Sequence, residues 1–154
     1  MNGNTTCSEI VIIGDGITGI FNSTQKTHID YVFGTAYQIA SLVDVMNYKF
    51  KKSDIEQITI GIGISYGRAL MIKAGYKGSG INDVVWMGDV VNEASKLSGY
   101  GNNSWNDFEI MVSGDFHYNL NEHNQGLLKY NSNRHCYHGN VVCTEMNEWY
   151  QANC

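Results

Sequence analysis

The chain contains no proline and little charge. None of its 154 residues is proline and 16% are charged, whereas a typical globular domain carries about 25% charged residues. The hydrophobic share of 43% is nonetheless ordinary for a folded protein. A chain with this much apolar material can bury a core, so intrinsic disorder is excluded. The length predicts a single domain.

Long apolar runs and paired cysteines are also absent. The sequence has no stretch of about 18 apolar residues, the length that a membrane-spanning helix needs. Residues 1–7 are polar and lack the basic and apolar regions of a secretory signal. The 4 cysteines form no CxxC pair, so we expect free thiols rather than a disulfide framework. These absences predict a cytoplasmic protein without a membrane partner.

An excess of positive charge is missing as well. The formal net charge is −5, which argues against broad binding to nucleic acids or anionic membranes. It does not exclude a nucleotide as a small substrate, because a metal ion can supply the positive charge that phosphates require.

The apolar periodicity indicates a mixed α and β chain. β-branched residues around turn glycines predict a hairpin over 9–22, and apolar residues at helical spacing predict a helix over 30–48. Further strands are expected at 57–66, 69–72, 84–87, 108–112, 134–138 and 141–146, and further helices at 89–98 and 113–120. The predicted class is α+β, with a mixed, largely antiparallel sheet and helices packed on it.

Glycines refine two of these elements. The strand 57–66 alternates isoleucine with small residues, so we expect a backbone or a ligand to approach one of its faces closely. Gly99 stands where a C-cap glycine would end the helix 89–98. Ser113 stands where an N-cap would begin the next helix.

The segment 14–19 matches the GxGxxG fingerprint of dinucleotide-binding proteins. That fingerprint requires a helix directly after the glycines, whereas the segment from Ile17 onward is expected to be extended. A Rossmann-type oxidoreductase is therefore disfavoured. Asp15 between two glycines suits a ligand of Mg²⁺ or Mn²⁺ beside a triphosphate, and the alternative is a hairpin turn that favours Asp-Gly.

Two other groups could carry chemistry. Asn92 and Lys96 are four residues apart and share one helix face, where they could hold a ribose and a phosphate; the alternative is a solvated face with Glu93 paired to Lys96. The run 135–138, His-Cys-Tyr-His, contains zinc-ligand types. Neighbours on a strand point to opposite faces, so the spacing fits no structural zinc pattern well. The alternative is a phosphate contact from His138.

Three segments in order resemble the catalytic domain of the class III nucleotidyl cyclases. They are residues 13–16, 60–67 and 86–97, the last containing the pattern GDxVNxAxxL. The resemblance covers residues 9–148 and leaves 1–8 and 149–154 as tails. It implies the ferredoxin-like α+β fold of that family and an enzyme that cyclises a nucleoside triphosphate.

The resemblance also implies roles for individual residues. Asp15, followed by Gly16, corresponds to a metal-binding aspartate of the family. Asn92 corresponds to the residue that orients the ribose. Lys96 stands in place of the arginine that stabilises transition-state charge, and lysine lacks the bidentate fork of arginine. His138 stands near the family's phosphate-contacting lysine.

Base selection departs from the purine-specific members. The two positions that read the purine edge are Val11 and Val85, and valine would leave purine polar groups without partners. In these two valines and in the run 73–86, the chain is similar to the pyrimidine cyclases of the bacterial Pycsar anti-phage systems. Those enzymes make cyclic UMP or cyclic CMP. The alternatives are a purine cyclase with an unusual pocket and an inactive cyclase-like module that binds nucleotide or dimerises.

The resemblance further implies two Mn²⁺ or Mg²⁺ ions per site, a homodimer with active sites at its interface, and an effector that responds to the cyclic nucleotide. The family's first strand and its metal-binding aspartate have no counterpart before the predicted strand at Glu9. We therefore expect the chain to be N-terminally incomplete rather than degenerate.

Overall fold

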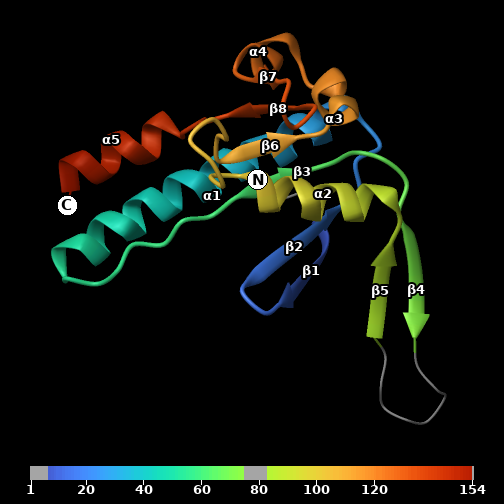
Figure 1. Ribbon diagram of the computed structural model, residues 1–154, viewed down its shortest axis with the longest axis horizontal. Coiled ribbons are helices and arrows are strands. Elements are labelled where there is room, and N and C mark those ends of the chain that lie inside the picture. Colours follow the sequence, from blue (N-terminus) through green and yellow to red (C-terminus); the bar gives the residue numbers. More distant parts are fainter. Residues whose placement is uncertain (1–6, 75–82, 154) are drawn as a thin grey trace.

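The computed structural model describes residues 7–74 and 83–153. Short strands alternate with helices along the chain, as Figure 1 shows. In order, the elements are β1 (Cys7–Ile13), β2 (Gly16–Phe21), α1 (Lys26–Lys52), β3 (Ile62–Ile64), β4 (Leu70–Ala74), β5 (Asp83–Met87), α2 (Asp89–Tyr100), β6 (Ile110–Val112), α3 (Gly114–Asn119), α4 (Glu122–Gly126), β7 (Lys129–Asn131), β8 (Cys136–Gly139) and α5 (Thr144–Asn153).

A four-stranded sheet forms the centre, with the strand order β3-β6-β8-β7. β3 runs parallel to β6, whereas β6 and β7 are both antiparallel to β8. The hairpins β1–β2 and β4–β5 are separate two-stranded sheets that project on the same side of the molecule (Figure 1). The predicted α+β class with a mixed sheet is confirmed, and so is the hairpin within 9–22.

Helices α1 and α2 cover opposite faces of the central sheet. Ile110 and Val112 of β6 belong to the core cluster that α1 supplies with Phe33 and its neighbours. Met111, which lies between them on the strand, instead packs with Leu97 of α2. Because successive strand residues point to opposite faces, the two clusters lie on the two sides of the sheet.

Glycines in the segment leading into β3 bring α2 directly onto the backbone. A Cβ atom placed on Gly63 would overlap the main chain of α2 at Ala94, and one placed on Gly61 would overlap it at Ser98. Ile62 and Ile64 pack on the other side, against the α1 cluster. The close approach predicted for this strand is therefore confirmed, and a helix backbone makes it.

The predicted strand 57–66 is wrong in its extent, because only 62–64 pairs with another strand. Side chains bind the main chain before it. Asn47 of α1 donates to the Ile58 carbonyl at 2.7 Å and accepts from the Ile58 N–H at 2.8 Å. Asn102 donates to the Ile60 carbonyl at 2.9 Å. The segment is extended, but its backbone groups at Ile58 and Ile60 bond to asparagine side chains rather than to a neighbouring strand.

Several helix ends differ from the prediction. α2 continues through Gly99, and Gly101 is its C-cap, with its N–H bonded to the carbonyls of Leu97 and Ser98 at 3.2 Å. In a sequence, a glycine inside a helix has the same appearance as a C-cap glycine, which is why Gly99 was predicted to end α2. The N-cap at Ser113 is confirmed, since its hydroxyl accepts from the Phe116 N–H at 3.2 Å. α1 is longer than predicted at both ends.

The C-terminal region was predicted least well. The strand expected at 141–146 is wrong: that segment is irregular and then enters α5. The β-branched pair Val141 and Val142 suggested a strand, but β8 ends at Gly139. α5 packs along α1, with the rings of Tyr48 and Tyr150 4.8 Å apart. The short elements α4 and β7 were not predicted.

None of the helices within 7–74 and 83–153 is long and apolar enough to cross a membrane. Residues 75–82 of the run 73–86, which contributed to the resemblance, lie outside the described residues.

Candidate functional site

Asp15 lies at the tip of the β1–β2 hairpin. Ile13 pairs with Gly16 across the ladder, so Gly14 and Asp15 form a two-residue turn. Gly14 has φ of +62°, which matches the first central position of a type II′ turn, where glycine is required. The extended course of β2 after the turn removes the helix that a dinucleotide-binding fingerprint needs.

The hairpin tip offers one carboxylate to a metal ion. Asp15 and Gly16 are both exposed. Across the described ranges, no group of three or more His, Cys, Asp or Glu side chains is placed to hold a metal. Mg²⁺ and Mn²⁺ accept few protein ligands when phosphates supply the other oxygens. The donor type therefore fits such an ion, but Asp15 alone does not make a complete site.

The second group of predicted residues lies on α2. Asn92 and Lys96 are exposed and one turn apart. The helix begins after Gly88, whose φ of 135° is available to glycine but not to most residues. The Gly88 carbonyl accepts from the Asn92 N–H at 3.2 Å. This bond closes the first turn of α2 and fixes the backbone of Asn92 in the helix.

Lys96 does not pair with Glu93. The Glu93 carboxylate accepts a hydrogen bond of 2.5 Å from the Ser65 hydroxyl instead. The Lys96 ammonium lies 5.9 Å from the centroid of the Tyr100 ring, one turn further along α2. Within the described part of the chain Lys96 makes no ion pair. Its charge therefore remains available to a ligand, which favours the ligand-binding interpretation of this helix face.

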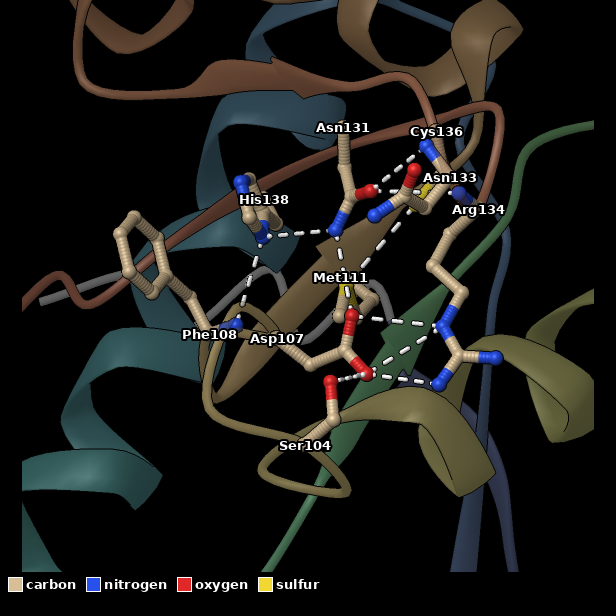
Figure 2. A network of polar contacts seen from close by, with 9 residues as sticks. All are labelled: Ser104, Asp107, Phe108, Met111, Asn131, Asn133, Arg134, Cys136 and His138. Atoms are coloured by element: carbon tan, nitrogen blue, oxygen red, sulfur yellow. Dashed lines mark hydrogen bonds and ion pairs between the residues drawn. The ribbon is translucent and has the colours of Figure 1, made fainter.

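A second cation lies at the same ring and was missed in the sequence. The guanidinium carbon of Arg134 lies 4.3 Å from the Tyr100 centroid. Arg134 is held by Asp107, whose carboxylate it contacts at 2.7 Å (Figure 2). Asp107 is buried, and its bond to Arg134 lowers the pKa of the carboxyl below its ordinary value. The partners are 27 residues apart, so no local spacing pattern could have revealed the pair.

His138 belongs to this buried network. Its side chain is 5% exposed, and Nδ1 accepts the Phe108 N–H at 3.3 Å. The ring stacks on Phe108 at 4.3 Å and lies beside Asn131 (Figure 2). Burial lowers the pKa of His138. The ring therefore packs against Phe108 and Asn131 rather than facing an open surface, and the phosphate contact from His138 stays a prediction.

The zinc ligand types do not converge. Cys136 is buried and its thiol contacts the Met111 sulfur at 3.8 Å. His135 is exposed, with Nδ1 3.5 Å from the Tyr130 hydroxyl. Burial raises the pKa of the Cys136 thiol, so the thiolate that zinc requires is disfavoured.

The two base-reading positions lie on different hairpins. Val11 is half-buried on β1, and Val85 is 41% exposed on β5. Trp86, the next residue of β5, faces the other way and donates to Glu9 of β1 at 2.5 Å. The face of β5 that meets β1 is thus the face of Trp86, not that of Val85.

The predicted metal ligand and the predicted pair on α2 therefore lie in two separate places. Asp15 lies at the hairpin tip, whereas Asn92 and Lys96 lie on α2, and no hydrogen bond or ion pair within 7–74 and 83–153 joins the two groups. Each group has chemistry suited to part of a nucleoside triphosphate.

Sequence comparison places the chain among relatives of the nucleotidyl cyclases. Two curated proteins match it, and both are named uridylate cyclase. The one from Treponema porcinum is 39% identical over 97% of this chain and 53% of its own length. The one from Gulbenkiania mobilis is 36% identical over 80% of this chain and 50% of its own length. The predicted resemblance to the pyrimidine cyclases is confirmed by these relatives.

The chain spans about half the length of the curated relatives it matches. No known family profile matches it. No solved structure matches it either.

Proposed function

We propose that this chain is the catalytic part of an enzyme that converts a pyrimidine nucleoside triphosphate, UTP or CTP, to its 3′,5′-cyclic nucleotide and pyrophosphate. The observation that carries the proposal is the similarity to uridylate cyclases along nearly the whole chain. The exposed pair Asn92 and Lys96 on α2 supports it, because both side chains are free to meet a ligand. The names of the relatives favour UTP.

The reaction is an intramolecular phosphoryl transfer. The ribose 3′-oxygen attacks the α-phosphorus, the bond to the bridging oxygen breaks, and pyrophosphate leaves. Asn92 would hold the ribose so that its 3′-oxygen lies in line with the leaving group. Lys96 would stabilise the charge that develops on the phosphate oxygens. A lysine does this as a point charge, without the fork of an arginine.

Asp15 is the residue that would hold a divalent cation together with the phosphates. We propose Mn²⁺ or Mg²⁺, with two ions per site. Such ions supply charge neutralisation and lower the pKa of the attacking hydroxyl. The exposed position of Asp15 at a glycine turn supports this assignment, since a bulky triphosphate can approach it from solvent.

We propose that the complete site forms between two copies of the chain. Asp15 would come from one subunit, and Asn92 with Lys96 from the other. The separation of the two groups on the hairpin tip and on α2 supports this arrangement. It also agrees with the ferredoxin-like cyclase fold, for which the parallel pair β3 and β6 with α2 between them in sequence is supporting evidence.

The biological role follows from the product. We propose that the cyclic pyrimidine nucleotide is a second messenger in Pycsar-type anti-phage defence, read by an effector that responds to it. The resemblance to the pyrimidine cyclases supports this role.

The test is to incubate the intact protein with each of the four nucleoside triphosphates and Mn²⁺ and to identify products by mass spectrometry. We expect a cyclic pyrimidine nucleotide from the wild type and none from Asp15→Ala. A cyclic purine would contradict the assignment of Val11 and Val85. No product from any triphosphate, with nucleotide still bound, would favour an inactive binding module.

A further inference from the structure

A carboxylate and an indole link the two hairpins. Trp86 of β5 donates its Nε1–H to the Glu9 carboxylate of β1 at 2.5 Å, and the contact is partly buried. Within the described part of the chain this is the one side-chain hydrogen bond that joins the β1–β2 hairpin to the rest of the molecule.

The strand alternation places this pair beside Val11. Glu9 and Val11 are two apart on β1 and share a face, and both are half-buried, while Ile10 and Ile12 on the other face are exposed. Thr18 lies directly opposite Val11 on the ladder and therefore shares the same face. The face of the hairpin that bears Val11 thus also bears Thr18 and the Glu9 carboxylate, to which Trp86 is bound.

Valine cannot satisfy the polar edge of a pyrimidine. Uracil presents an N3–H donor between two carbonyl acceptors, whereas cytosine presents a bare N3 acceptor and an amino donor. A buried donor or acceptor without a partner weakens binding considerably. The polar groups that this face offers are therefore the ones able to distinguish the two bases.

Glu9 has the correct chemistry for uracil. A carboxylate only accepts hydrogen bonds, and Trp86 binds its Oε2, while no other hydrogen bond of this carboxylate occurs in the described residues. The remaining oxygen can accept the uracil N3–H. The same oxygen would face the N3 lone pair of cytosine and repel it.

We propose that Glu9, held in place by Trp86, is the specificity-determining residue that selects UTP over CTP. This inference rests on the proposed cyclase function and on the base lying against the Val11 face. Trp86 is a positioning residue, because it acts on the base through Glu9. Its ring also offers a stacking surface for a planar base.

The test compares UTP and CTP cyclisation by the intact protein and by Glu9→Gln. Glutamine can still accept from Trp86 through its carbonyl, but its NH₂ then donates toward the base, which suits the cytosine N3. We expect the UTP-to-CTP ratio of kcat/KM to fall by about tenfold or more, with CTP turnover rising. Glu56→Gln is the matched control, because Glu56 is an exposed carboxylate between α1 and β3. This variant should leave the ratio unchanged.

Trp86→Phe tests the positioning role of Trp86 separately from the role of Glu9. It keeps an aromatic ring and removes the N–H, so we expect the ratio to fall without the gain in CTP turnover seen for Glu9→Gln. Equal losses with both substrates in Glu9→Gln would overturn the inference, because a purely structural link between the hairpins behaves that way. If the wild type makes no cyclic nucleotide at all, the proposed function fails and this inference fails with it.

Discussion

Asn92 and Lys96 lie one turn apart on α2, and their spacing depends only on the helix itself. The positions of His138 and Glu9 depend on residues far away in the chain. His138 is buried by Phe108 and Asn131, and Glu9 is bound by a tryptophan 77 residues away. Neither environment has a sequence signature.

His138 makes a testable contribution to the pH dependence of stability. Burial lowers its pKa from the ordinary value of 6.5. Just below pH 6.5 the His138 imidazole is protonated in the unfolded chain but stays neutral in the folded chain. The free energy of unfolding therefore falls as the pH falls. We expect the melting temperature to decrease from pH 6.5 downward, and to decrease less steeply in His138→Gln.

Circular dichroism melts between pH 7.5 and pH 5 would measure this dependence. His123→Gln changes an exposed histidine of α4 and is the matched control. Asp107 does not interfere, because its pKa lies below the ordinary value of 3.8 and its contribution is lost only in stronger acid. An identical pH slope for the wild type and His138→Gln would contradict the assignment.

At the scale of the element, α2 is positioned by glycines in addition to the packing of Leu97 on Met111. Gly61 and Gly63 allow the helix to rest on the main chain of β3 and its preceding segment. The position of Asn92 and Lys96 therefore depends on residues that carry no chemistry themselves.

Gly63→Ala tests this contact. The new Cβ would meet the main chain of α2 at Ala94 and Ser98, neither of which can move without the whole helix. We expect a loss of about 1–3 kcal/mol in the free energy of unfolding, measured by urea denaturation, and a lower rate of the proposed cyclisation.

Gly99→Ala is a matched substitution with the opposite expectation. Gly99 lies inside α2, and a Cβ there meets nothing within 4 Å. Because alanine is the better helix former by about 1 kcal/mol, we expect this variant to be more stable than the wild type. If Gly63→Ala behaved like Gly99→Ala, the close approach of α2 to β3 would be refuted.

Elements were predictable where their hydrogen bonds are local. The hairpin at 9–22 has its own turn residues, and the helix from Asp89 begins with an acidic residue directly after a glycine. The extended segment before β3 was mistaken for a longer strand because its partners are asparagine side chains, from Asn47 and Asn102. α5 was missed because Val141 and Val142 gave its approach the composition of a strand.

For the molecule as a whole, the proposed function requires two copies of the chain to complete a site. Asp15 and the α2 pair lie on separate elements, and each carries part of the expected chemistry. A symmetric dimer places the same surface of each subunit against the other, so two such sites would form. No property of one chain in isolation tests this claim.

The most direct test mixes two inactive variants of the intact protein. Asp15→Ala and Asn92→Ala should each make almost no cyclic nucleotide from UTP and Mn²⁺. In an equal mixture about half of the dimers are mixed, and each mixed dimer contains one intact site of two. We therefore predict that the mixture regains about a quarter of the wild-type rate. A mixture as inactive as its components, although subunits exchange, would contradict an active site shared between two chains.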